Sequence, residues 1–217
     1  MRHLIWLPKD CTLHHSAIEQ AQQRLANANE ALSRLESANT LLAVERAWSE
    51  YLIAVSAIYS KLEIGSKGFG PSEAWFGRKK KQRKDDALLR YLQQARHAEE
   101  HGIAHGVDAV ETIHLTLIKV GDEWQILSTI YVSSVDSQES RLNNDAAVEV
   151  RDESGNLVES QTIITHAVQL LKITNRGVTY APPDKFLGYV IVDKSPLGVA
   201  RLSIPFFAEL VADASKL

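Results

Sequence analysis

The chain has 217 residues, of which 45% are hydrophobic, and its formal net charge at pH 7 is −3. This length and apolar content allow one large or two small folded domains, and they exclude a wholly disordered chain. The negative net charge means that any contact with nucleic acid must come from a local cluster of cations. The single cysteine, Cys11, excludes an internal disulfide.

The sequence also gives an expectation about location. No apolar run approaches the roughly 20 residues that a membrane-spanning helix needs. Residues 1–7 are soon followed by Pro8, Lys9 and Asp10, and they lack the apolar stretch of a signal peptide. We therefore expect a cytoplasmic protein that makes no contact with a membrane.

The first half of the chain has the periodicity of amphipathic helices. In residues 16–36, and again in residues 41–62, apolar side chains recur every three or four positions, which predicts two helices. Ser16 and Glu19 have the spacing of a capping box at the start of the first helix, and Gly65 is expected to end the second. The second helix has the broader apolar stripe, so we expect it at the centre of a bundle.

Residues 65–84 are predicted to form a loop, because residues that disfavour regular structure are frequent there. They are Gly65, Gly68, Gly70, Pro71 and Gly77. We expect Trp75 and Phe76 to anchor this loop in the core, and the alternative is that their rings stack on nucleic-acid bases. The loop ends in six cations within seven residues, namely Arg78, Lys79, Lys80, Lys81, Arg83 and Lys84. Such a run is either a solvated surface or a salt-sensitive contact for RNA phosphates.

A third helix is predicted to begin at Asp85 and Asp86, whose carboxylates suit a helix N-terminus. It is expected to end near Gly102, because glycine favours the left-handed conformation of a helix stop. One face of this helix is apolar. At 100° per residue, the opposite face carries a polar stripe that consists of Arg90, Gln94, His97 and His101. Arg96 lies at the rim of this stripe.

After residue 107 the period changes from helical to alternating, which predicts strands. A hairpin turn is expected at Gly121-Asp122, and a second hairpin around residues 154–156. Residues 161–174 are rich in β-branched side chains and favour a strand, although a helix also fits them. Asn175-Arg176-Gly177 and Pro182-Pro183 are expected to be turns. Pro205 is expected at the first position of a closing helix.

The predicted fold class is therefore α+β. We expect a helical bundle in residues 1–105, followed by a small antiparallel strand-rich domain with a closing C-terminal helix in residues 106–217. The boundary is expected near residues 102–108, and the short linker there allows the two halves to pack as one body.

The polar stripe of the third helix combines groups that could cleave RNA. A histidine can accept or donate a proton near neutral pH, and an arginine can hold a phosphate and stabilise the charge that develops on it. Cleavage needs a base for the 2′-hydroxyl, an acid for the leaving oxygen and a cation for the transition state. Two histidines and two arginines beside a run of cations supply these roles without a metal.

The segment Arg96-His97-Ala98-Glu99-Glu100-His101 resembles the R-x4–6-H motif of the HEPN superfamily, whose members are helical bundles and often metal-independent ribonucleases. The resemblance covers roughly residues 16–105. It implies that Arg96 and His101 are the catalytic pair and that His97 supports them. It also implies a homodimer whose two motifs share one cleft, and it implies no cofactor. The basic run and Arg90 would then hold the RNA.

Two other hypotheses start from the same residues. Arg96 and Glu100 have the i, i+4 spacing of a helical ion pair, and His101 suits the negative end of the helix dipole. On this interpretation the protein is a non-catalytic dimerisation or interaction protein, whose C-terminal half contacts a protein partner. The third hypothesis is RNA binding without cleavage.

A metal site and a nucleotide cofactor site are not expected. His97, His101 and His105 are the residues that such a metal site would use, but Gly102 interrupts the helix before His105 and no cysteine lies nearby. The sequence also has no glycine-rich phosphate or dinucleotide motif.

Overall fold

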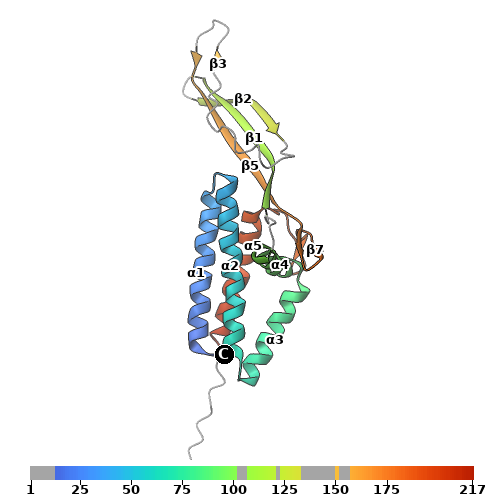
Figure 1. Cartoon of the computed structure of the whole chain (residues 1–217). Helices are drawn as coiled ribbons and strands as arrows, with labels where there is room; N and C mark the ends of the chain where they lie inside the picture. The colour runs from blue at the N-terminus through green and yellow to red at the C-terminus, as the bar shows by residue number, and fades with distance from the viewer. Residues whose placement is uncertain (1–12, 102–106, 121–122, 133–149, 152–156) are drawn as a thin grey trace, which may run out of the picture.

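A computed structural model of the chain describes residues 13–101, 107–120, 123–132, 150–151 and 157–217 (Figure 1). Within these ranges four helices come first, antiparallel strands follow, and one helix ends the chain. This order confirms the α+β class. None of the helices in the described ranges has the length and apolarity that crossing a bilayer requires.

The first two helices form a long antiparallel hairpin, as their apolar periodicity predicts. They are α1 (His15–Ser37) and α2 (Leu41–Ser66). The hydroxyl of Thr40 caps α2 by accepting a hydrogen bond from the Ala43 amide at 3.2 Å. Most of the buried residues of α1 are small, and they are Ala17, Ala21, Ala28 and Ala31. These small side chains allow the two helices to pack closely.

Two details predicted for this hairpin are wrong. The N-cap of α1 is His14, and Ser16 hydrogen-bonds with the His14 ring at 3.0 Å instead of forming a capping box with Glu19. Gly65 does not end α2, because it lies inside the helix and is buried against α1. A Cβ atom at Gly65 would be only 2.3 Å from the Cβ of Ala17, so the missing side chain allows the close approach of α1.

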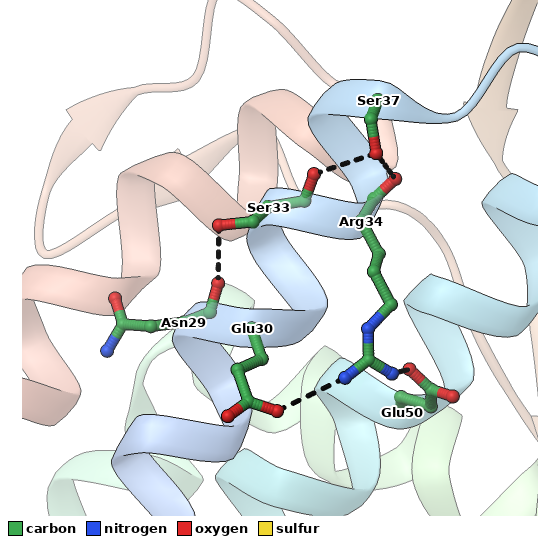
Figure 2. A network of polar contacts seen from close by, with 6 residues as sticks. All are labelled: Asn29, Glu30, Ser33, Arg34, Ser37 and Glu50. Atoms are coloured by element: carbon green, nitrogen blue, oxygen red, sulfur yellow. Dashed lines mark hydrogen bonds and ion pairs between the residues drawn. The ribbon is translucent and has the colours of Figure 1, made fainter.

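On the surface, polar contacts join the end of α1 to the start of α2 (Figure 2). Arg34 donates hydrogen bonds to Glu30, at 3.2 Å, and to Glu50 of α2. The hydroxyls of Ser33 and Ser37 donate to carbonyl oxygens one turn earlier, at 3.2 and 3.1 Å. Since these ion pairs are about half exposed, their contribution is small, of the order of a few tenths of a kcal/mol.

The prediction of a loop at residues 65–84 is wrong. Most of this segment is a helix, α3 (Gly70–Asp85). Pro71 lies in its first turn, where the missing amide hydrogen costs no helical hydrogen bond. Trp75 and Phe76 are only 7% and 4% exposed, which confirms the expected anchoring. Burial of these two rings offsets the cost of about 1 kcal/mol for a glycine in the middle of a helix, Gly77.

The next helix, α4 (Ala87–His101), begins where the sequence predicts. The carboxylate of Asp86 accepts a hydrogen bond from the amide of Leu89 at 2.9 Å and so caps the helix. The predicted apolar face is buried and consists of Leu88, Leu89, Leu92, Ala95 and Ala98. Tyr91 of α4 donates a hydrogen bond to the carbonyl of Leu171 at 2.7 Å, which ties the helix to the chain after the main sheet.

The main sheet has three antiparallel strands in the order β2-β1-β5. They are β1 (Val107–Val120), β2 (Glu123–Val132) and β5 (Ser160–Leu170). Val120 pairs with Glu123, as a hairpin at Gly121-Asp122 requires, although these two turn residues lie outside the described ranges. Strand β5 confirms the favoured strand assignment for residues 161–170, but the strand ends at Leu170, and Ile173–Asn175 form a separate short strand. In Figure 1 the sheet extends away from the helices, past the loop that joins α1 to α2.

Three small hairpins complete the strand-rich part. They pair β3 (Val150–Arg151) with β4 (Leu157–Val158), β6 (Ile173–Asn175) with β7 (Val178–Tyr180), and β8 (Lys185–Phe186) with β9 (Tyr189–Val190). The strands of the first are those expected around residues 154–156, which lie outside the described ranges. Arg176 and Gly177 have φ angles of 49° and 77°, as the predicted turn between β6 and β7 requires.

The last helix, α5 (Pro196–Ala214), begins earlier than predicted. Ser195 is its N-cap and accepts a hydrogen bond from the Gly198 amide at 3.0 Å. Pro205 therefore lies inside the helix rather than at its first position. The helix packs against α1 and α2, where the hydroxyls of Tyr51 and Ser203 hydrogen-bond at 2.8 Å. The division into two domains near residue 105 stays a prediction, but α5 packs with the helices of the first half.

Gly65 gives a direct test of the close packing between α1 and α2. Replacing Gly65 with Ala should destabilise the protein by roughly 1–3 kcal/mol, because the new Cβ forces α1 and α2 apart. The matched control is Gly77→Ala in α3, where a Cβ would have no neighbour within 4 Å. That variant should gain about 0.5–1 kcal/mol from helix propensity. Urea unfolding followed by circular dichroism measures both free energies, and equal changes would contradict the packing described.

Candidate nucleic-acid interface

The six cations of the basic run lie on α3, and the fold divides them into two groups. Lys79, Lys80 and Arg83 contact other parts of the helical bundle and are partly buried. The remaining three, Arg78, Lys81 and Lys84, are exposed. The buried rings of Trp75 and Phe76 anchor one side of α3 in the bundle. The other side of α3 faces solvent, so the two groups of cations lie on different sides of the helix.

The two partly buried lysines form ion pairs with distant helices. Lys79 of α3 binds Asp213 of α5, with 3.0 Å between the nitrogen and the oxygen. Lys80 binds Glu63 of α2 at 2.7 Å. The hydrogen bond from each lysine lowers the pKa of its carboxylic partner. These lysines therefore connect α3 to the bundle, and their charges are partly neutralised.

Arg83 packs on an aromatic ring and has no carboxylate partner among the described residues. Its guanidinium carbon is 4.1 Å from the centroid of the Tyr59 ring, a cation–π geometry. Burial lowers the pKa of Arg83, while Tyr59 and Glu63 act in the opposite direction. The Nε atom of Arg83 is buried without a hydrogen-bond acceptor in the described structure. Arg83 thus packs against the bundle with its Nε atom buried and does not extend from the outer side of α3.

The exposed cations lie along α3 and at the start of α4. Arg78, Lys81 and Lys84 follow one another at three-residue spacing, which places them on neighbouring positions of one side of the helix. Arg90, near the start of α4, is also exposed and donates a hydrogen bond to the carbonyl of Lys84 at 3.4 Å. We call these four residues the exposed basic face. The exposed carboxylate that lies nearest to these four residues along the sequence is that of Asp85.

Neighbouring groups engage Gln94 in the polar stripe of α4 and Arg96 at its rim. Arg96 forms an ion pair with Glu100, with 2.5 Å between the nitrogen and the oxygen, and 20% of the Arg96 side chain is exposed. The amide oxygen of Gln94 accepts a hydrogen bond from Asn175 of β6 at 2.7 Å. His97 is half-buried. The ion pair is the one that the non-catalytic hypothesis expects from i, i+4 spacing.

The proposed catalytic pair is described only in part. His101 is the last residue of α4, and its side chain lies outside the described part of the structure. The separation of the Arg96 and His101 side chains therefore stays a prediction. Among the residues that the structure describes, no three or more His, Cys, Asp or Glu side chains gather as a metal site would require. His105, the third histidine of the metal hypothesis, lies outside the described ranges.

The partners of the basic run were not predicted from the sequence. Glu63 is 17 residues from Lys80, and Asp213 is 134 residues from Lys79. Helical spacing marks only pairs that are three or four residues apart, so it identifies Arg96 and Glu100 but neither of these longer pairs. The stacking of Arg83 on Tyr59 likewise joins two different helices.

No protein-family model matches the sequence, and no curated protein or solved structure matches it. Function is therefore argued from the placement of these residues.

The ion pair between Lys79 and Asp213 should couple the stabilities of α3 and α5. A double-mutant cycle with Lys79→Gln and Asp213→Asn should give a coupling of about 0.5–1 kcal/mol at pH 7, because both side chains are still partly exposed. Because the pKa of Asp213 is lowered, this stabilisation is fully present at pH values above the ordinary pKa of an aspartate. It is lost as the pH falls through the lower pKa of the folded state.

The matched control is the cycle between Lys216→Gln and Asp213→Asn. Lys216 contacts the other oxygen of Asp213 at 3.2 Å, but its side chain is 74% exposed, so its coupling should be smaller. Urea unfolding between pH 3 and 7, a range that spans the Asp titration, measures both couplings. A coupling between Lys79 and Asp213 that grows as the pH falls would contradict this account.

Proposed function

We propose that the protein binds RNA through the exposed basic face, which consists of Arg78, Lys81, Lys84 and Arg90. The division of the basic run on α3 carries this proposal. Three cations of the run pack against the helical bundle, and the other three are exposed, as Arg90 is. Arg78, Lys81 and Lys84 form no ion pair with any described residue. Their charges are therefore available to contact phosphates.

The arrangement favours contact with the phosphate backbone rather than with bases. The helical rise places Arg78 and Lys84 about 9 Å apart along the axis, so the face spans a few phosphates of a strand. Trp75 and Phe76, the aromatic residues of the same helix, are buried and do not offer their rings for stacking. Binding by cations alone is independent of sequence and sensitive to salt.

Removing the exposed cations should weaken binding and reduce its salt dependence. In the variant Arg78→Gln, Lys81→Gln, Lys84→Gln, the slope of log K against log salt concentration should become less steep by roughly 2. Each lost contact with a single strand contributes about 0.7 to that slope. Fluorescence anisotropy with a labelled single-stranded RNA at several salt concentrations measures this slope.

The matched control removes three exposed cations elsewhere, by Arg46→Gln, Lys172→Gln and Lys185→Gln. It changes the net charge by the same amount but leaves α3 intact. The salt slope of the control should stay close to that of the unchanged protein. An equal loss in both triple variants would show that net charge, and not the exposed basic face, determines the binding.

A second candidate function is metal-independent RNA cleavage of the HEPN type, by Arg96 and His101 with support from His97. The observation that favours it is that Arg96 and His97 are both partly exposed on α4, the helix that continues from the exposed basic face. Cleavage would require Arg96 to exchange its partner Glu100 for a phosphate. The homodimer that the resemblance implies, with two motifs in one cleft, belongs to this candidate.

Cleavage is tested with labelled RNA in the presence of EDTA. Arg96→Ala and His101→Ala should each remove activity, by at least about a hundredfold if they act as transition-state cation and proton-transfer group. Neither variant should change RNA affinity as much as the loss of Arg78, Lys81 and Lys84. Cleavage that persists in both variants would exclude these residues from the reaction, while RNA binding without any turnover would leave binding as the function.

A further inference from the structure

A half-open pocket lies where four helices meet, and its walls come from α2, α3, α4 and α5. Its enclosed part is small, about 10 Å³, which is room for a single water-sized group, and the empty space reaches about 230 Å³ only when the solvent-facing mouth is included. Apolar side chains form much of the wall, among them Val55, Leu92 and Phe207. The guanidinium of Arg83 also lines this pocket. An apolar pocket with a few converging polar groups is the usual form of a small-ligand site.

One nitrogen of the partly buried Arg83 guanidinium lacks a hydrogen-bond acceptor. This nitrogen is Nε, which is buried with no partner in the described structure, and a buried donor without an acceptor is costly. The Tyr59 ring stacks on one face of the guanidinium at 4.1 Å but accepts no hydrogen bond from its edge. This edge can donate two parallel hydrogen bonds to one oxyanion.

Other polar groups of the pocket are also without partners. The side chains of Ser56 and Gln93 line the pocket, and among the described residues neither makes a side-chain hydrogen bond. Hydroxyl and amide groups can donate to an anion. The pocket lining therefore combines the cation Arg83 with two side chains, Ser56 and Gln93, that can donate hydrogen bonds.

The carboxylates nearest to these groups are already engaged. Glu63, which acts on Arg83 electrostatically, binds Lys80 at 2.7 Å. Asp86 accepts hydrogen bonds from the backbone amides of Leu89 and Leu187, at 2.9 and 2.7 Å. Neither carboxylate therefore serves as the acceptor for Arg83. An acceptor that arrives from solvent would satisfy the Nε–H group of Arg83.

We propose that the mouth of this pocket binds a phosphate group, one of whose oxygens enters the pocket, held by the guanidinium edge of Arg83 and by the polar side chains of Ser56 and Gln93. A tetrahedral oxyanion accepts hydrogen bonds in several directions, whereas a single water molecule must also donate some. The group is either free phosphate or the terminal phosphate of a larger molecule. This inference does not depend on RNA binding by the exposed basic face, since Arg83 lies on the other side of α3.

Inorganic phosphate is the probe, titrated into the full chain by calorimetry at constant ionic strength, with chloride as the reference anion. The unchanged protein should bind with a Kd of roughly 1 mM or tighter. Arg83→Gln should weaken binding at least about tenfold through loss of the charge-assisted hydrogen bonds. Ser56→Ala, which keeps every charge, should weaken it by about threefold.

The matched control is Lys81→Gln, which removes an exposed cation of the same helix two residues away. It should change phosphate affinity less than twofold, whereas it should weaken RNA binding if the exposed basic face is used. The two proposals can therefore fail separately. Melting curves show whether each variant folds. If Arg83→Gln does not fold, Ser56→Ala still tests the proposal.

The source of the phosphate group is distinguished by competition. An RNA oligonucleotide with a 5′-phosphate, compared with the same oligonucleotide with a 5′-hydroxyl, should displace inorganic phosphate if the pocket holds an RNA end. If neither displaces it, the ligand is free phosphate or a small phosphate ester, and the pocket assignment stands. Absence of phosphate binding by the unchanged protein, or an equal loss in Arg83→Gln and Lys81→Gln, would overturn the proposal.

Discussion

The ring of Tyr59 on α2 lies at the contact that fixes α3 on the bundle. It packs edge-on against Phe76 of α3 and against Phe207 of α5, with 6.3 Å between the ring centroids in each pair. The guanidinium of Arg83 covers its face. Because these contacts, together with buried Trp75, fix the rotation of α3 about its own axis, they decide which cations of the basic run face the bundle and which face solvent. The exposed basic face and the Arg83 pocket are both consequences of this orientation.

Elements stabilised by an apolar repeat were predictable from the sequence, and elements stabilised by a few distant contacts were not. The repeats of α1, α2 and α4 predicted these helices. Helix α3 has almost no such repeat, and its stability comes from two buried rings and from ion pairs to α2 and α5. Its glycines and proline therefore suggested a loop. Pro205 misled in the same way, since Ser195 caps α5 a full ten residues earlier.

The candidate site shows the same limit. The sequence identified the cations of the basic run and the polar stripe of α4, because both are local. It could not divide the cations into partnered and exposed ones, because Glu63 and Asp213 are far away in the chain. The Arg83 pocket draws residues from four helices and has no local pattern at all. The pair of Arg96 and Glu100 is local and was foreseen as an alternative to catalysis.

We propose that packing around Tyr59 leaves one side of α3 free to bind RNA, and lysine reactivity tests this proposal most directly. The protein is acylated with a lysine-selective reagent, with and without saturating single-stranded RNA, and each site is quantified by mass spectrometry. RNA should protect Lys81 and Lys84 and leave Lys79 and Lys80, which bind Asp213 and Glu63, unchanged. Unchanged reactivity at Lys81 and Lys84, or protection of the partnered lysines instead, would contradict the account.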